Sequence, residues 1–431
     1  MNLLSRCSAF LALAGSLFAQ SVPDGYSSSL HSLPNSAGYP AVLTNAIAWF
    51  DGTDVTLQET GLAPRSLLHF SVPRFGAFLV PLRNGALLFA DSSFGDVYLL
   101  ATSVGALPIL LNNLILPYDA AELSPTTVVI SAKTGGFGAS DNDLIRLDLT
   151  TGVMTALGSV GGASGALAID AHGDLIYATA PQSFPPPSGS VQILRWSALQ
   201  ITLAQLGAGS LSLANAQVMV TGLDAVGDLA LDTDDDLFFI DWLNGTVGEI
   251  NQLHQSPWTT NFIDYTVSNV SCGTLQFIDS SGEFEPYSTT SSGELCLHET
   301  DFLQVSQLRK IQPRSAGLTA GNFSVIPRGP FTLQVQQATP NGIAIFGLAL
   351  AQNLNAFTLT VQGFEQSIPW DNSLFIGITS FAALDALGHN QLQLNNPGLP
   401  AGTRLIAACA FSDSGLQLLG ATQVRSLLLA P

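Results

Sequence analysis

The sequence predicts an all-β protein: a six- or seven-bladed β-propeller followed by a small β-sandwich domain. Three observations support this fold class. A short pattern of apolar strands and acidic turns repeats between residues 40 and 315, helical periodicity is scarce, and the chain becomes almost uncharged after Arg314. Repeats indicate an array of small sheets, and a shift in composition indicates a domain boundary. The sequence therefore predicts a propeller at 20–314 and a sandwich at 315–431.

The first residues have the pattern of a secretion signal. Arg6 precedes an apolar run from Ala9 to Ala14, and small residues follow up to Ala19. A basic start, an apolar core about ten residues long and a small residue at its end are what signal peptidase reads. The run is too short to span a hydrocarbon core of about 30 Å. We expect residues 1–19 to be removed and the mature protein to be secreted or held at the cell surface, without a transmembrane segment.

The charge balance excludes several partners. The chain has 13 Lys and Arg residues against 32 Asp and Glu residues, and its only lysines are Lys133 and Lys310. Nucleic-acid binding needs a basic stripe that this composition lacks, and anionic membranes are disfavoured for the same reason. The acidic balance by itself is a solubility device. Proteins and glycans stay open as partners.

The cysteines do not indicate chemistry. Cys272, Cys296 and Cys409 remain after the predicted signal, too few for a scaffold built on disulfides. Cys272 and Cys296 are close enough in sequence to pair in an oxidising compartment, and the sequence leaves open whether they do. Cys409 lies in an apolar stretch and is expected to be a buried thiol.

The two clearest copies of the repeat are Gly165–Tyr177 and Gly227–Phe239, and weaker copies begin at Gly85 and Gly273. Each clear copy has two apolar runs of strand length, joined by a turn rich in Asp and Gly. This is the pattern of a β-hairpin. The apolar runs scarcely alternate with polar residues, which suits strands buried on both faces.

The spacing of the copies predicts the number of blades. Repeat starts are expected near residues 46, 86, 127, 166, 228 and 274. The first four are about 40 residues apart, the length of one four-stranded blade. The wider later gaps predict inserted loops, one of them with three prolines at 185–187. A β-solenoid or a chain of sandwich domains is the alternative. The best helical candidate, 197–216, is interrupted by Gly207 and Gly209.

The repeat resembles the blade signature of NHL-type and gluconolactonase-like (SMP-30) β-propellers. Both clear copies read Gly-x-Leu-Ala-Ile/Leu-Asp, then a turn, then Leu-Ile/Phe-Tyr/Phe. The resemblance implies an architecture more strongly than an activity. Gluconolactonase-like propellers hold a divalent metal in the channel with Glu, Asn and Asp from separate blades. Because the flanking motifs do not match, these ligands are not assigned here. Residues of those types in the repeat region are Glu59, Glu122, Asn142, Asn215 and Asp224.

The C-terminal segment has the pattern of a sandwich. Strand-like runs at 329–336, 343–350 and 391–394 are separated by turn residues, and another run begins at Leu405. Short strands at this spacing predict a sandwich of about 100 residues. The segment resembles the C-terminal β-sandwich of many large exported proteins of environmental bacteria, with shared Pro-Asn-Gly and Asp-x-x-Gly turns. That resemblance implies a bacterial origin and a role in display, anchoring or export.

The sharpest candidate site is an acidic turn. Asp232, Asp234 and Asp236 have the alternate spacing with which a loop wraps oxygens around calcium. Leu237 and Leu243 stand where an EF-hand needs Gly and Glu, so the loop is not an EF-hand. A solvated hairpin turn explains the same residues. We therefore predict that no cofactor is required and that calcium is the candidate ion.

Other motifs do not commit the chain to catalysis. The six histidines are far apart, and none forms a zinc pattern with cysteine. Gly161–Gly165 resembles a serine nucleophile motif, but it precedes a strand rather than joining a strand to a helix. The sequence has no phosphate loop or dinucleotide fingerprint. Four tryptophans fit either sugar stacking or packing within blades. They are Trp196, Trp242, Trp258 and Trp370.

Together these observations predict an exported, non-catalytic binding or structural module, with a ligand that the sequence does not specify. The alternative is a metal-dependent hydrolase or lactonase that uses the propeller channel. The two differ at the axis, because the enzyme needs carboxylate and amide ligands that converge there and the module does not.

Overall fold

The computed structural model describes most of the chain between residues 26 and 429. The described residues are 26–34, 37–233, 235–243, 246–251, 259–263, 271–278, 284, 293–300, 306–313, 317–319, 325–326, 331–336, 338–350, 356–361, 364–369, 375–394, 404–413, 418–421 and 425–429, some of them by backbone alone. The chain divides into two compact units. One consists mainly of Ser29–Ile278 and Leu295–Lys310, and the other mainly of Ile311–Pro431. The division between residues 314 and 315 stays a prediction.

The first unit contains six four-stranded antiparallel sheets, here called blades 1 to 6. Blades 1 and 2 are β2 (Gly38–Leu43), β3 (Ala46–Phe50), β4 (Asp54–Glu59) and β5 (Arg65–His69), then β6 (Gly76–Pro81), β7 (Leu87–Asp91), β8 (Asp96–Leu100) and β9 (Ile109–Asn113). Blades 3 and 4 are β10 (Pro117–Ser124), β11 (Thr127–Ala132), β12 (Asp141–Asp148) and β13 (Met154–Gly161), then β14 (Leu167–Ile169), β15 (Leu175–Ala178), β16 (Val191–Trp196) and β17 (Gln217–Leu223).

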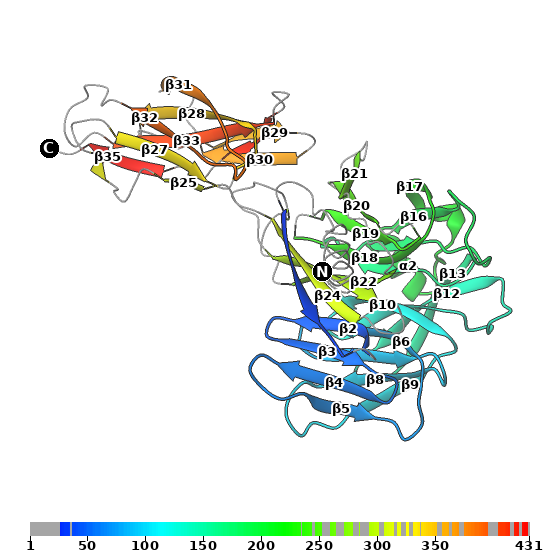
Figure 1. Cartoon of the computed structure of the whole chain (residues 1–431). Helices are drawn as coiled ribbons and strands as arrows, with labels where there is room; N and C mark the ends of the chain where they lie inside the picture. The colour runs from blue at the N-terminus through cyan, green and yellow to red at the C-terminus, as the bar shows by residue number, and fades with distance from the viewer. Residues whose placement is uncertain are drawn as a thin grey trace, which may run out of the picture. The chain divides into compact units, whose positions relative to one another are not determined.

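Blade 5 is β18 (Val226–Leu231), β19 (Leu237–Asp241), β20 (Thr246–Asn251) and β21 (Thr259–Ile263). Blade 6 is β22 (Ser271–Ile278), β23 (Glu294–Thr300), β24 (Ser306–Pro313) and β1 (Tyr26–Ser32). The N-terminal strand β1 is thus the outer strand of the last blade. In Figure 1 the blades follow one another in colour from blue to yellow-green, and the dark blue β1 lies beside β24.

The inner strands of the blades form a closed ring. Each of them contacts the inner strand of the blade before it and of the blade after it; they are β2, β6, β10, β14, β18 and β22. Gln276 of β22 joins the last blade to the first, because its Oε1 accepts the N–H of Val42 at 3.0 Å and its Nε2 donates to the carbonyl of the same residue. The predicted propeller is therefore confirmed, and the described chain forms it with six blades.

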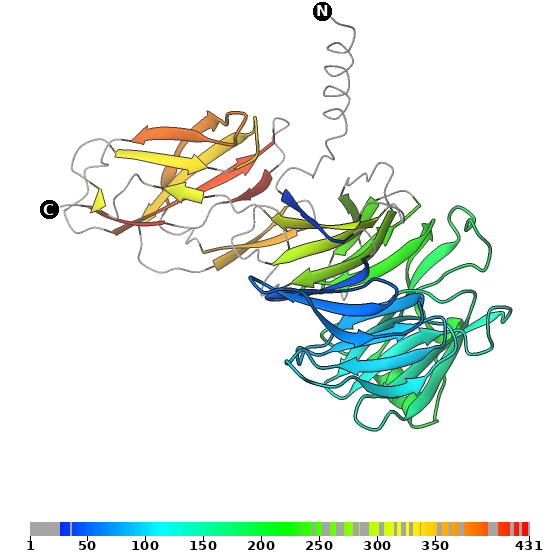
Figure 2. The ribbon, with the colours of Figure 1, turned by 60° about the horizontal axis from the view of Figure 1, so that its bottom comes forward.

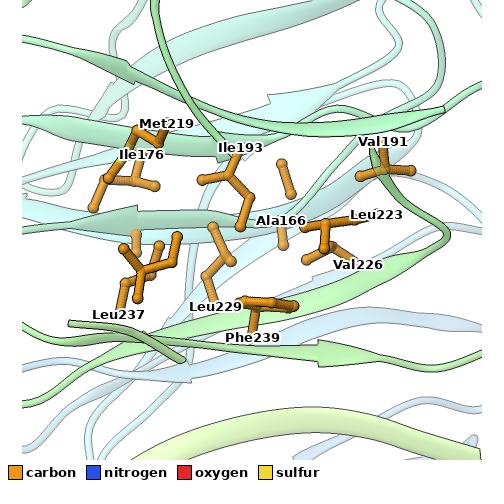
Figure 3. Packing of buried hydrophobic residues seen from close by; sticks show 13 residues of the cluster. Ala166, Ile176, Val191, Ile193, Met219, Leu223, Val226, Leu229, Leu237 and Phe239 are labelled. Atoms are coloured by element: carbon orange, nitrogen blue, oxygen red, sulfur yellow. The ribbon is translucent and has the colours of Figure 1, made fainter. Parts of the chain in front are cut away.

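Neighbouring blades pack against each other through apolar side chains. Every residue of the second strands β7 and β19 is buried. A second strand lies inside its sheet and is covered on both faces by adjacent blades, so apolar side chains are favoured at every position. Figure 3 shows one such interface, in which Ile176 and Ile193 of blade 4 pack with Leu229 and Phe239 of blade 5.

The predicted repeat starts fall on two different strands of the blade. Those near residues 46, 86 and 127 lie on or beside the second strands β3, β7 and β11, whereas the later three lie on or beside the inner strands β14, β18 and β22. Both kinds of strand are short apolar runs next to Gly or Asp, and the pattern does not separate them. The Gly85 copy forms an antiparallel pair as predicted, and its strands β7 and β8 are the second and third strands of blade 2.

The predicted helix is confirmed, and it is short. Helix α2 (Ala198–Gln205) lies between β16 and β17. Ser197 caps it, since its N–H donates to Oε1 of Gln200 at 2.8 Å and its Oγ accepts the Gln200 N–H. Gly207, with φ of +69°, follows the last turn. Within the described residues, no helix is both long enough and apolar enough to cross a bilayer.

The second unit is the predicted β-sandwich. Its strands are β25 (Gly317–Thr319), β26 (Val325–Ile326), β27 (Phe331–Gln336), β28 (Ile343–Leu350), β29 (Ala356–Val361), β30 (Phe364–Pro369), β31 (Phe375–Ala383), β32 (Asn390–Leu394), β33 (Arg404–Ser412), β34 (Leu418–Ala421) and β35 (Arg425–Leu429). They form a β26-β35-β33-β28-β31 sheet with β34 beside β33, a β25-β27-β32 sheet and the hairpin β29-β30, drawn from yellow to red in Figure 2.

Alternation along the strands builds the core of the sandwich. Leu333 and Val335 of β27 are buried, as are Leu405 and Ala407 of β33. The predicted Asp-x-x-Gly turn forms at Asp385, whose Oδ1 accepts the N–H groups of residues 387 and 389, both at 2.8 Å. Local turn chemistry and period-two burial thus fix this unit as the sequence predicts.

Candidate binding face of the propeller

The order of the strands gives the propeller two distinct faces. The inner strand of each blade begins at one face and ends at the other, and the three strands after it alternate in direction. We call the face where inner strands begin face A. It carries the loops between second and third strands and the connections between blades. Face B carries the turns between first and second strands and between third and fourth strands.

Side chains from blades that are not neighbours meet at the axis. The phenol of Tyr118 in β10 of blade 3 donates to the carbonyl of Gly227 in β18 of blade 5 at 3.4 Å. Blade 4 lies between them in the ring, so this contact forms where the inner strands converge. Tyr39 of blade 1 lies close enough to Tyr118 to act on it electrostatically. As whole residues Tyr39 and Tyr118 are 38% and 39% exposed, whereas burial around their hydroxyl groups raises the pKa of both phenols.

Two aspartates lie beside these phenols. One carboxylate oxygen of Asp119 accepts the N–H of Leu167 in blade 4 at 2.7 Å. One carboxylate oxygen of Asp228 accepts the N–H of Leu275 in blade 6 at 2.6 Å. The second oxygen of each accepts the N–H of the following residue. Both aspartates therefore join their inner strand to the next one, and β-bulges at the start of β10 and β18 redirect side chains there.

No basic side chain among the described residues pairs with either axial carboxyl group, and their hydrogen-bond partners are backbone N–H groups. Burial raises the pKa of Asp119 to about 6, although its backbone hydrogen bonds act in the opposite direction. Burial and the nearby charge of Asp119 raise the pKa of Asp228 well above its usual range. The pKa of the Tyr118 phenol is raised by burial and then by both carboxylates. A pair of this kind favours a shared proton or an external cation.

Face A also carries a row of aromatic rings, three of them exposed and one, Trp242, half-buried. Phe94, Phe137, Phe184 and Trp242 occupy the loop between second and third strands in blades 2, 3, 4 and 5. Phe94 is 56% exposed, Phe137 92% and Phe184 84%. The rings of Phe184 and Trp242 stack, with centroids 6.0 Å apart and planes 7° apart. We call these four residues the aromatic arc.

Basic side chains in the loops next to the arc are already engaged. The guanidinium of Arg74 donates to Asp91 at 2.7 Å and to Asp96 at 2.6 Å. Lys133 is buried, and its Nζ donates to a backbone carbonyl at 3.4 Å. Asp141, at the start of β12, is exposed, and no described basic residue pairs with it. Within the part of the chain that the structure describes, the loops of face A therefore offer carboxylates and rings without an available cation.

The predicted calcium ligands belong to the β18–β19 turn on face B. Oδ1 of Asp232 accepts the N–H of Asp236 at 2.9 Å, a bond that closes the hairpin. Asp235 reaches blade 4, where its carboxylate lies 3.1 Å from Nδ1 of His172. Asp234 lies outside the described residues, so the calcium site stays a prediction. Among the described residues, no group of three or more His, Cys, Asp or Glu side chains is placed to hold a metal.

The five Glu, Asn and Asp residues considered as metal ligands of a lactonase do not come together. Each has a separate structural partner: Glu59 lies 3.9 Å from Arg65, Glu122 and Asp224 accept backbone N–H groups in loops, Asn142 donates to the buried Tyr177, and Asn215 accepts the Trp196 indole N–H. The residues that do converge at the axis are different ones, Asp119 and Asp228.

The tryptophans and cysteines have different fates. Trp196 is fully buried and its Nε1 donates to a backbone carbonyl at 3.1 Å, so packing in blade 4 is its role. Trp258, Trp370 and the side chain of Cys272 lie outside the described residues. Cys296 is buried, and the question that the sequence left open, whether it pairs with Cys272, lies outside the described residues. Cys409 is buried as predicted, and burial raises the pKa of its thiol to about 12.

Sequence reasoning missed both the axial residues and the arc, although a signal for the arc was present. Each exposed phenylalanine of the propeller directly precedes Gly or Pro: Phe75-Gly, Phe94-Gly, Phe137-Gly and Phe184-Pro. An aromatic ring in such a turn lies outside any strand that would bury it. Asp228 was read as part of the hairpin signature, and Asp119 matches no local motif.

Comparison with known proteins gives likenesses to solved structures alone. No family model matches the chain, and no curated protein matches it. A gluconolactonase from Xanthomonas campestris is 12% identical, over 67% of this chain and 90% of that one, with a TM-score of 0.47. Regucalcin, a calcium-binding protein from Agrobacterium tumefaciens, is 12% identical, over 69% and 96%, with a TM-score of 0.42.

A third similar structure is PorZ, an essential surface component of the type-IX secretion system of Porphyromonas gingivalis. It is 10% identical, over 92% of this chain and 52% of that chain, with a TM-score of 0.42. Likenesses this distant carry no argument about function, which has to come from the side chains described above.

Proposed function

We propose that this protein is an exported, non-catalytic binding module whose ligand binds on face A of the propeller. The observation that carries the proposal is the aromatic arc, because equivalent loops of four successive blades each place a ring there. Exposed aromatic patches of this kind mark binding surfaces on soluble proteins. The blades hold the loops in fixed positions, so little ordering is needed when a ligand binds.

A metal-dependent hydrolase or lactonase is the second candidate, favoured by the axial pair Asp119 and Asp228. Two carboxylates from separate blades, without a basic partner among the described residues, suit a hard cation. Against this candidate, each carboxylate oxygen already accepts one backbone N–H group and keeps one lone pair, which leaves room for a hydrogen-bond donor but few sites for coordinating a metal ion. The described residues also supply no third ligand of the Asp, Glu, His or Cys type.

One set of assays on the mature chain, 20–431, separates these candidates. Gluconolactone hydrolysis is measured with calcium, manganese or zinc, and binding is measured with labelled basic peptides, acidic peptides and oligosaccharides. We expect no turnover above the metal control, and binding that is lost in Phe137→Ser combined with Phe184→Ser. Metal-dependent turnover that disappears in Asp119→Asn would overturn the proposal in favour of the lactonase.

Export is part of the same proposal and is supported by the signal pattern around Arg6 and Ala19. The full chain, expressed in a bacterial host with an intact secretion pathway, should be recovered outside the cytoplasm with its N-terminus after Ala19. Mass spectrometry of the intact product measures this directly. A cytoplasmic product that keeps residues 1–19 would remove export from the proposal without affecting the binding face.

A further inference from the structure

We propose that face A binds a basic segment of another protein, with the aromatic arc contacting apolar and cationic side chains and a Lys or Arg directed to Asp119 and Asp228. This inference rests on the proposed function and narrows its ligand to one chemical class. It is argued from charge, from ring chemistry and from the extent of the surface.

The charge of face A favours a cation. Asp119 and Asp228 have no basic partner among the described residues, and Asp141 is exposed and unpaired there as well. The neighbouring cations Arg74 and Lys133 are held by other groups. A surface with carboxylates and no available cation attracts basic ligands and repels anionic ones.

The rings of face A are suited to cations too. The guanidinium carbon of Arg74 lies 4.0 Å from the ring centroid of Phe70 and 4.6 Å from that of Phe94. Guanidinium and ammonium groups stack on aromatic faces with a favourable energy of about 0.5–2 kcal/mol each. Phe137 and Phe184 offer exposed faces of the same kind, with no described cation over them. A basic partner can therefore use the rings as well as the carboxylates.

The extent of the surface favours a chain segment over a small cation. The aromatic arc runs over blades 2 to 5, whereas Asp119 and Asp228 lie at the axis, where the inner strands converge. One small ion cannot contact both places. A segment with alternating apolar and basic side chains places some of them on the arc while others point to the axis.

The test uses the mature chain and three short fluorescent peptides. The first contains Lys, Leu and Gly, the second has Glu in place of Lys, and the third has Ser in place of Leu. Fluorescence anisotropy gives the dissociation constants. The first peptide should bind at least about tenfold more tightly than the other two. Phe137→Ser with Phe184→Ser should raise the dissociation constant of the first peptide by about tenfold or more.

The matched control lies on face B. Val104 and Leu107 are 84% and 83% exposed, so Val104→Ser with Leu107→Ser removes two similarly exposed but smaller apolar side chains from a turn between third and fourth strands. This control should change the dissociation constant by less than about twofold. Because all four positions are exposed, both double variants should keep the wild-type melting midpoint.

The charge part of the proposal is tested separately. Asp119→Asn with Asp228→Asn should weaken the binding of the first peptide, which contains Lys, Leu and Gly, and should reduce the salt dependence of that binding. Since both aspartates join inner strands, Asp141→Asn is added as a charge variant with no such bonds, and it should reduce the association rate.

Three results would overturn the inference. The first is that the acidic peptide binds as tightly as the basic one, and the second is that the face B control loses as much affinity as the face A variant. Binding of chito- or cello-oligosaccharides, without binding of the basic peptide, would also overturn it. If that glycan binding is lost in the Phe137 and Phe184 variant, the proposed function survives. If nothing binds face A, the proposed function fails as well.

Discussion

Face A and face B are made by loops of the same blades, yet some aspartates of face A are used differently from those of face B. On face B, Oδ1 of Asp170 accepts the N–H groups of His172 and Asp174, and Oδ1 of Asp232 accepts that of Asp236. On face A, Asp141 is exposed at a strand start, and the axial pair lies nearby without a cation. The acidic residues behind the net charge of −19 therefore include carboxylates that build turns and carboxylates that have no cation beside them.

The exposed apolar side chains divide in the same way. Among the described residues, the large apolar side chains exposed in the turns of face B are aliphatic, and the exposed phenylalanines of the propeller are on face A. The face B examples include Leu62, Val104, Leu107, Val153 and Leu199. Single aliphatic side chains on a surface are ordinary, whereas rings repeated in equivalent loops indicate a binding surface. The comparison teaches that position in the blade, rather than hydrophobicity alone, separates the two.

The largest effect should come from Arg74, a cation whose role on face A is structural. Arg74→Ala leaves Asp91, which is fully buried, without its partner, and should destabilise the protein by about 3–5 kcal/mol. Arg146→Ala removes a looser pair with Asp148, 3.8 Å apart, and should cost at most about 1 kcal/mol. Urea unfolding measures both. Similar small losses would mean that Arg74 is not structural.

A smaller effect should separate the aspartates of the two faces. Asp170→Ala removes the acceptor of two turn bonds on face B and should cost about 1–2 kcal/mol. Asp141→Ala on face A should stay within about 0.5 kcal/mol of the wild type. Thermal melts of both variants compare them. If Asp170→Ala and Asp141→Ala destabilise the protein equally, the carboxylates of the two faces do not differ in their structural role.

The smallest predicted effect is a pH dependence that arises at the axis. The folded pKa of Asp119, about 6, lies above the value of about 3.9 for an unfolded chain, so the folded state holds more protons between them. The axial contribution to stability should therefore rise by about 1 kcal/mol as the pH falls from about 7 to about 5. Asp228→Asn should flatten this rise.

One histidine opposes that trend and has to be removed in the same experiment. Burial lowers the pKa of His298 to about 4, and its Nε2 lies 3.0 Å from Oγ of Ser306. Stability from this group is lost as the pH falls from about 6.5 to about 4, since the unfolded state then takes up the proton. In His298→Gln the acid stabilisation should become steeper. If neither Asp228→Asn nor His298→Gln changes how the free energy of unfolding depends on pH, this dependence does not arise from the axial aspartates and His298.

The hairpins could be predicted from the sequence because they depend on local properties. Gly165–Tyr177 and Gly227–Phe239 contain strand-length apolar runs and turn residues, and both form the expected pairs β14–β15 and β18–β19. The sandwich strands followed for the same reason. Whether an apolar run is an inner or a second strand depends on its neighbours in space. The sequence pattern does not contain this information, so three of the repeat starts fell on second strands and three on inner strands.

The axial site could not be predicted, because ring closure creates it. Tyr118 and Gly227 are 109 residues apart in the chain and meet only when blades 3, 4 and 5 are in place. The aromatic arc could be predicted in part. Phenylalanine before Gly or Pro was visible in the sequence, but its common face follows only from the order of strands within each blade.

The closure of blade 6 by β1 has a consequence for how the protein is made. The N-terminal strand pairs with β24, and Ser27 Oγ donates to the carbonyl of Gln312, 285 residues further along. A chain that emerges from a ribosome or a translocation channel N-terminus first must hold β1 without its partner until β24 has followed. Contacts this distant in sequence form late. The ring can therefore close only after β24 has been made, so the propeller cannot complete itself while the chain is still being synthesised up to that strand.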